Sequence, residues 1–200
     1  PARFFVRFFK NHGLLSVNDR PQWRVIRGGS RTYIEALTAP FRDRIRLNCP
    51  VEWVRRYPTH VHVKPWGGPV GWFDEVVIAT HSDQALRLLA DPTPRERGIL
   101  GAIPYQENEV VLHTDTRLLP RWKRAWAAWN YHLPTQPRDR VAVTYNMNIL
   151  QGLDTPETFC VTLNRGETID PARVLYRTTY HHPVFTEAGI RAQAHRDEIS

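Results

Sequence analysis

The sequence predicts a mixed α/β chain whose first half contains a buried strand and whose second half is rich in antiparallel strands. A β-branched run at residues 76–79 leads into a helical pattern at residues 83–89, which Thr80 and Ser82 can cap. An uninterrupted apolar run is typical of a strand buried on both faces. The candidate strands of the second half are spaced by turn-like segments and comprise residues 109–114, 125–132, 140–146, 158–163 and 173–180. Such spacing favours a largely antiparallel sheet.

Composition indicates a globular chain with a basic surface. The 200 residues are 42% hydrophobic, and 27 Lys and Arg against 20 Asp and Glu give a formal charge of +7. The basic residues are scattered, which favours a solvated surface over a nucleic-acid groove, although anionic cofactors or lipid surfaces would be attracted. No run approaches the roughly 18 apolar residues of a membrane span, so we expect no integral membrane segment.

The cysteines indicate the cellular compartment of the protein, and the first residue bears on where the natural chain starts. Cys49 and Cys160 lie in apolar, strand-like segments without CxxC spacing, which predicts two buried free thiols in a reducing compartment. We therefore expect a cytoplasmic protein. The chain begins at Pro1 and its one methionine is Met147, so the natural start is expected upstream, where a targeting signal could also lie.

The first forty residues predict two helices. Residues 2–10 place phenylalanine on more than one face of a helix, a pattern that calls for burial, and Gly13 can end this helix. A strand-like piece then meets Gly28 and Gly29, after which Ser30 can cap a helix over residues 32–39. Paired glycines before a helix allow close backbone approach to a ligand and favour an anion. An ordinary tight turn is the alternative.

Three further strands are expected before the 76–79 run. Residues 44–48 alternate as a half-buried strand should, and residues 51–55 and 60–64 form a hairpin around the turn at 57–59. The two prolines within residues 91–94 mark a boundary between the two patterns. A terminal helix is expected from residue 186 to about 196.

Motifs for hydrolytic or metal chemistry are missing from the sequence. It contains no GxSxG, no P-loop and no HExxH. His60 and His62 share a strand face and form either a metal pair or two surface histidines. His182 precedes a proline and can be aimed into a pocket. Asp115 and Asp139 lie near strand ends and have no identified partner.

An aromatic segment could contact a substrate. In residues 126–131, period 2 puts Trp129 and Tyr131 on one face of a strand and Trp126 and Asn130 on the other. These aromatics either line a cavity or pack against a helix.

Together these segments resemble the flavin-containing amine oxidase superfamily, and within it the bacterial branch of NAD/FAD-binding proteins described as FAD-dependent oxidoreductases. The segments that carry the resemblance are residues 1–16, 22–37, 45–54, 73–91, 109–115, 125–132, 143–153 and 182–185. The resemblance implies a partial Rossmann-like FAD-binding domain joined to a substrate domain with a largely antiparallel sheet and helices. It divides the chain into 1–21 (substrate-domain helix and loop), 22–92 (part of the FAD domain), 93–190 (substrate domain) and 191–200 (terminal helix, returning toward the FAD domain).

The resemblance covers only the middle of the family's pattern. None of the 11 glycines forms the opening GxGxxG motif, and the closing flavin segment is missing too. We therefore expect an internal fragment whose partners include the N- and C-terminal segments of its own chain, and which is inactive and binds flavin weakly or not at all when isolated.

The resemblance also implies roles for individual residues. The cofactor contacts would be Gly28, Gly29, Ser30, Pro50, Val51, Ala79 and Thr80. Trp129, Tyr131 and His182 would contact substrate, and no catalytic side chain or metal ligand is assigned.

One departure bears on the reaction. Many relatives carry a lysine on the first substrate-domain strand, where this chain has Asn108 and Glu109. The expected function is oxidation of a C–N or C–C bond of a small, apolar or lipid-like molecule by hydride transfer to FAD. The alternatives are a non-catalytic binding protein of the same fold that has lost flavin, or a basic nucleic-acid binder.

Overall fold

The structure, a computed structural model, describes residues 2–18, 21–22, 24–133 and 140–199 and divides into two compact units. The first unit comprises Pro1–Pro21, Phe41–Tyr105 and Pro183–Ser200, and the second comprises Gln22–Pro40 and Gln106–His182. Mixed α/β architecture with antiparallel sheets is confirmed. The short 3-10 helices are Ala39–Arg44, Thr116–Leu118, Lys123–Ala125, Gly166–Thr168, Pro171–Arg173 and Arg196–Glu198.

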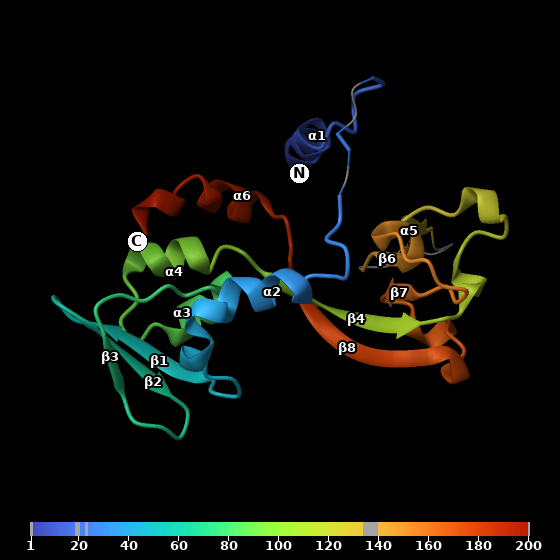
Figure 1. Ribbon diagram of the computed structural model, residues 1–200. Helices are drawn as coiled ribbons and strands as arrows, with labels where there is room; N and C mark the ends of the chain where they lie inside the picture. Colours follow the sequence, from blue (N-terminus) through green and yellow to red (C-terminus); the bar gives the residue numbers. More distant parts are fainter. Residues whose placement is uncertain (1, 19–20, 23, 134–139, 200) are drawn as a thin grey trace. The chain divides into compact units, whose positions relative to one another are not determined.

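The sheet of the first unit is a three-stranded antiparallel meander (Figure 1). Its strands, in spatial order, are β1 (Val51–Arg56), β2 (Val61–Pro65) and β3 (Gly71–Phe73). The expected hairpin is confirmed, and the backbone N–H of Tyr57 donates to the carbonyl of His60 at 2.9 Å to close its turn.

Helices of the first unit cover this sheet. They are α3 (Ser82–Leu88), α4 (Pro94–Leu100) and α6 (Glu187–Gln193), and Figure 1 shows α4 between α3 and α6. A capping box starts α4, because Thr93 and Glu96 each accept a hydrogen bond from the other's backbone N–H. Glu96 also accepts from both Nη atoms of Arg56 on β1, at 2.5 and 2.9 Å, which ties helix to sheet.

The first helix, α1 (Ala2–Asn11), agrees with its expected range, and Gly13 follows it at φ +64°. Its Phe4 ring stacks on Phe185 at 4.5 Å between centroids. However, no residue of α1 is buried, and the Phe5 side chain is 59% exposed. The burial that the phenylalanine pattern calls for is thus not achieved within the described residues.

Two expected strands of the first half are wrong. Residues 76–79 are extended but unpaired, and Val77 is 90% exposed, because no described strand lies beside them to complete a ladder. Residues 44–48 leave a 3-10 helix and enter a turn, in which Asn48 adopts φ +53°. A left-handed residue breaks an extended run, and asparagine tolerates that conformation better than most residues.

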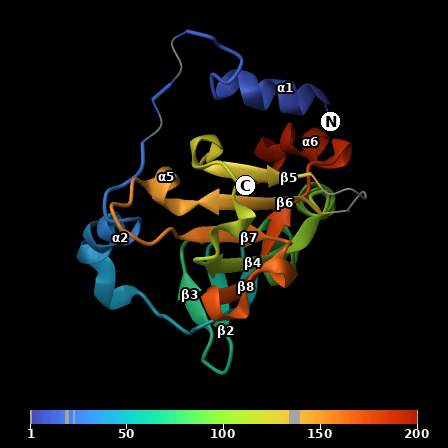
Figure 2. The same ribbon diagram turned by 90° about the vertical axis from the view of Figure 1, so that its right-hand side faces the viewer.

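The second unit is built on a five-stranded sheet in the order β5-β6-β7-β4-β8, which Figure 2 shows nearly face-on. The strands are β4 (Tyr105–His113), β5 (Trp129–His132), β6 (Ala142–Asn146), β7 (Cys160–Leu163) and β8 (Val174–Pro183). The pairs β5–β6, β6–β7 and β4–β7 are antiparallel, which confirms the expected sheet. Of the expected strand 125–132, only the last four residues pair, because Lys123–Ala125 form a 3-10 turn.

The two helices of the second unit are α2 (Arg31–Thr38) and α5 (Met147–Gln151). Ser30 stands at the N-cap position of α2, as expected, but in helical conformation and without a side-chain capping hydrogen bond.

One face of the five-stranded sheet is buried and unusually polar. The cross-strand row on this face runs Asn130, Thr144, Thr162, Val111 over β5, β6, β7 and β4. Val111 also packs with Leu118 and Ile169 in the apolar core. Polar groups in such a place must be hydrogen-bonded to one another, since burying them unpaired costs free energy.

Both cysteines are free thiols. Cys160 lies buried in β7, and burial raises the pKa of its thiol to about 11. Cys49 is only half-buried and lies outside the strands, so the expected strand placement holds for Cys160 and is wrong for Cys49. In the described ranges, no helix has the length and apolar content that crossing a membrane requires.

Candidate functional site

The double glycine adopts an open left-handed conformation. Gly28 and Gly29 have φ values of +81° and +80°, which side-chain-bearing residues rarely adopt. A Cβ built on Gly29 would meet no atom within 4 Å, whereas one on Gly28 would lie 3.0 Å from the Thr32 methyl group. The backbone here is therefore open to close approach, and Ser30 beside it is exposed.

Pro50 and Val51 lie at the start of β1, beside an irregularity in its pairing with β2. The Pro50 carbonyl accepts a hydrogen bond from the backbone N–H of Trp66 at 2.8 Å. This leaves the Pro50 ring and the Val51 side chain, which is 36% exposed, available for apolar contact.

Ala79 and Thr80 end the extended segment before α3 and are exposed. The Thr80 hydroxyl donates to the carbonyl of His81 at 3.2 Å. Thr80 and Ser82 were expected to cap α3, but the N-cap position belongs to His81, whose backbone N–H donates to the Gln84 side chain.

Trp129 and Tyr131 share the exposed face of the five-stranded sheet, as their spacing predicts. Their side chains are 54% and 59% exposed, while Asn130 between them is 8% exposed on the opposite face. The row beside Trp129 continues through Tyr145 and Val161 on β6 and β7. This face is therefore aromatic and apolar.

His182 lies next to Asn108 of β4. Its Nδ1 is 3.0 Å from the Asn108 side-chain nitrogen, and Asn164 donates to the Asn108 side-chain oxygen at 2.7 Å. His182 is exposed and does not line the cavity described below. The prediction that its side chain points into a pocket is therefore not confirmed for that cavity.

A hydrogen-bonded chain of four side chains crosses the buried face of this sheet. His132 Nε2 is 2.7 Å from the Thr144 hydroxyl, which is 2.8 Å from the Thr162 hydroxyl, which is 2.8 Å from His113 Nε2. Burial lowers the pKa of His113, and burial together with the positive charge of Arg165 lowers that of His132. Both imidazoles are therefore neutral at pH 7.

Donors on the other ring nitrogens fix both tautomers. Arg165 Nη1 donates to His132 Nδ1 at 2.7 Å, and the backbone N–H of Asp115 donates to His113 Nδ1 at 3.1 Å. Each Nδ1 must therefore be the acceptor, so each Nε2 carries the hydrogen and donates to a threonine.

Asp115, for which the sequence identified no partner, continues this network. Its carboxylate accepts two hydrogen bonds from the Arg117 guanidinium, at 2.9 and 2.6 Å, and one from the backbone N–H of Asp170 at 2.9 Å. Arg117 holds the pKa of this buried carboxyl well below its usual range. Asp139 lies outside the described residues.

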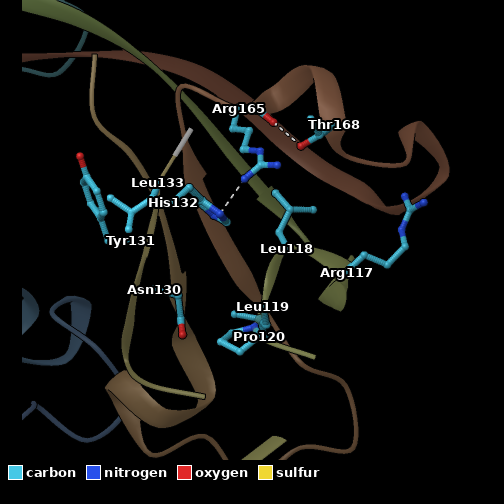
Figure 3. A pocket seen from close by; sticks show the side chains of 10 residues that line it. All are labelled: Arg117, Leu118, Leu119, Pro120, Asn130, Tyr131, His132, Leu133, Arg165 and Thr168. Carbon is cyan, nitrogen blue, oxygen red and sulfur yellow. Dashed lines mark hydrogen bonds between the residues drawn. The ribbon is translucent and has the colours of Figure 1, made fainter. Parts of the chain in front are cut away.

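A cavity of about 410 Å³ opens at one end of this network (Figure 3). Its lining residues come from β5, the segment after β4 and the segment after β7, and are Arg117, Leu118, Leu119, Pro120, Asn130, Tyr131, His132, Leu133, Arg165 and Thr168. Figure 3 shows the Arg165 guanidinium directed at His132. Of the residues expected to contact substrate, Tyr131 alone lines this cavity.

Neither this cavity nor its network was predicted from the sequence. His132, Thr144 and Thr162 are far apart along the chain, and alternating polar residues in a strand normally indicate a solvated face. One signal was available. Alternation along the two strands puts Thr144 on the same face as Ala142, and Thr162 on the same face as Cys160, and small apolar neighbours of this kind indicate a buried face.

Metal binding is not supported. His60 Nε2 and His62 Nε2 lie 3.1 Å apart on the first unit's sheet, beside the Tyr57 and Trp72 rings. Among the residues that the structure describes, no three His, Cys, Asp or Glu side chains are grouped to hold a metal ion.

Solved structures that match the chain include a fatty acid isomerase from P. acnes, which produces CLA, and a putrescine oxidase. The isomerase matches with a TM-score of 0.52 and 16% identity over 78% of this chain and 40% of its own. The oxidase, bound to putrescine, matches with a TM-score of 0.47 and 13% identity over 68% of this chain and 29% of its own. This chain thus spans less than half the length of either protein.

No curated protein matches the chain. The sequence does match the family described as flavin containing amine oxidoreductase, over residues 6–143. Because this match covers more than half of the 200 residues, the chain belongs to the flavin-containing amine oxidoreductase family.

Proposed function

We propose that this chain is part of an FAD-dependent oxidoreductase that oxidises a C–N or C–C bond of a small organic molecule. The observation that carries the proposal is the family match over residues 6–143, which spans both the double-glycine segment and the strand that bears Trp129 and Tyr131. Bound FAD would supply the hydride acceptor, so no nucleophilic side chain is needed.

The residues assigned to the cofactor fit a ligand that is held by backbone and small side chains. Gly29 offers open left-handed backbone, and Val51 and Ala79 offer exposed apolar surface. These properties support the assignment of Gly28, Gly29, Ser30, Pro50, Val51, Ala79 and Thr80 as cofactor contacts. A double glycine in an ordinary tight turn would adopt the same backbone conformation. The Gly29→Ala variant in the Discussion therefore tests the assignment.

The exposed face of the five-stranded sheet supports the substrate role of Trp129 and Tyr131. Aromatic rings bury a large apolar area and orient a ligand at low entropic cost, while they exclude water from it. His182 lies on β8, at the opposite edge of the sheet from β5, and its Nδ1 is occupied by Asn108, so its substrate role rests on the family resemblance alone.

The second candidate is a non-catalytic relative that has lost flavin. It is favoured by the polar cluster of Asn108, Asn164 and His182, in which the side chains are hydrogen-bonded to one another. The resemblance implies that many relatives have a lysine in this region instead. A nucleic-acid role is less supported, because many arginines pair with carboxylates, as Arg56 does with Glu96 and Arg177 with Glu109.

Anaerobic mixing of the full-length gene product with candidate amines and unsaturated acids distinguishes the two. Bleaching of the flavin absorbance by one substrate class supports the oxidoreductase. A protein that holds FAD but transfers no hydride from any class would contradict the catalytic proposal. A folded protein that neither retains nor takes up FAD would support the relative that has lost flavin.

A further inference from the structure

Arg165 is a cation that, among the residues the structure describes, has no carboxylate partner. It is half-buried in the wall of the 410 Å³ cavity, and its one hydrogen-bonded side-chain partner is the neutral ring of His132. Among the described residues, no Asp or Glu lies within ion-pairing distance of Arg165, whereas the other cavity arginine, Arg117, is paired to Asp115. A guanidinium removed from bulk water without a counter-charge is costly, and such groups are commonly retained to bind an anion.

His132 holds this guanidinium in a fixed direction. The imidazole donates through Nε2 to Thr144 and accepts from Arg165 Nη1, so its ring orientation is set on both sides. One of the five guanidinium N–H groups is used in this contact. The remaining donors form a planar fork, which matches the two oxygens of a carboxylate.

Other polar groups in the cavity lining are already engaged, and among the described residues no second unpaired charge stands beside Arg165. The Asn130 amide is used internally, because it donates to the carbonyls of Ala127 and Thr144 and accepts from the Ala127 N–H. The Thr168 hydroxyl donates to the Arg165 carbonyl at 3.0 Å. The apolar residues of the lining include Leu118, Leu119, Pro120 and Leu133.

We propose that this cavity binds an organic carboxylate with a short apolar chain, with the carboxylate on Arg165. One unpaired guanidinium suits one negative charge, whereas phosphate would call for a second cation. The cavity shares Tyr131 with the proposed substrate wall, but the wall otherwise uses the face that carries Trp129, whereas the carboxylate site uses the buried face and the edge of the sheet. The inference rests on Arg165 and does not depend on flavin binding.

Isothermal titration of the full-length gene product with hexanoate tests this. We expect saturable binding of hexanoate and no comparable binding of hexan-1-ol or hexylamine, because only the acid carries the negative charge. Inorganic phosphate should bind more weakly than hexanoate, because it gains nothing from the leucine walls. Equal binding of the alcohol, tighter binding of phosphate, or no binding of hexanoate would each overturn the proposal.

Variants assign the binding to Arg165. Arg165→Ala should weaken hexanoate binding about 10- to 100-fold, the loss expected for a charge-assisted pair. Arg165→Lys keeps the charge and should recover only part of the affinity, because a lysine lacks the fork. Arg121→Ala is the matched control, since Arg121 lies outside the cavity against the Trp122 ring and its loss changes the charge equally. Equal affinities in Arg121→Ala and Arg165→Ala, with both proteins folded by circular dichroism, would contradict the assignment.

Discussion

Arg165 donates a hydrogen bond from Nη1 to Nδ1 of His132 across 2.7 Å, and this contact fixes the protons of a buried network. A guanidinium cannot accept a hydrogen bond, so His132 must carry its hydrogen on Nε2 and direct it at Thr144. His113 faces Thr162 in the same way from the far end. The two threonine hydroxyls thus receive hydrogens from both sides.

The first prediction concerns these tautomers. Nitrogen NMR of the two ring systems should show both His113 and His132 as neutral Nε2–H imidazoles at pH 7. Each ring should titrate below about 6.5, the ordinary histidine pKa, because burial lowers the pKa of each ring. An Nδ1–H tautomer for His132 would contradict the contact with Arg165.

The second prediction concerns the threonine pair. Thr162→Val keeps the side-chain shape but leaves the His113 N–H without an acceptor on a fully buried face. We expect the free energy of unfolding to fall by about 1–3 kcal/mol, the cost of an unsatisfied buried donor. The measurement is urea denaturation followed by circular dichroism.

Thr179→Val on β8 is the control for that substitution. Thr179 is exposed, so valine should change stability by no more than about 0.5 kcal/mol. If both variants lose the same stability, the buried hydroxyl chain contributes nothing specific.

The third prediction concerns pH and the first unit. Hydrogen bonds from Arg56, and then those from Thr93, lower the pKa of Glu96 to about 2, below its ordinary 4.5. A depressed carboxyl pKa gives stability that is present above the unfolded value and is lost as the pH falls. Stability should therefore decrease between pH 4.5 and about 2, and Glu96→Gln should flatten this part of the profile.

Glu96→Gln should also lower stability at pH 7 by about 1–3 kcal/mol, because it weakens a largely buried, charge-assisted pair. Glu187→Gln is the comparison, since its pair with Arg191 is exposed on both sides and should contribute less than about 1 kcal/mol. A pH profile for Glu96→Gln that coincides with that of the unchanged protein would rule out this role.

The fourth prediction concerns the double glycine. Gly29→Ala should reduce FAD retention by the full-length gene product, because a methyl group would occupy the open side of the backbone proposed to meet the cofactor. Gly152→Ala is the matched control: Gly152 has φ +63°, and a Cβ there also meets nothing within 4 Å. Both changes carry similar strain of about 1–2 kcal/mol. Equal FAD content in the two variants would remove Gly29 from the cofactor site.

Local patterns predicted most of the elements. The hairpin of β1 and β2 and the alternation of Trp129 and Tyr131 depend on neighbouring residues, and the structure confirms both. Strand 76–79 was wrong because β-structure needs a partner strand, which local sequence does not specify. The network from His132 to Asp115 was missed for a related reason, since register across four strands brings its members together.

The cofactor content of the purified full-length gene product tests the central claim most directly. Absorbance spectra taken before and after denaturation should show flavin bands, and the released flavin should be FAD at about one molecule per protein chain. A folded protein that is colourless and takes up no added FAD would contradict the proposed oxidoreductase and leave only the family's fold.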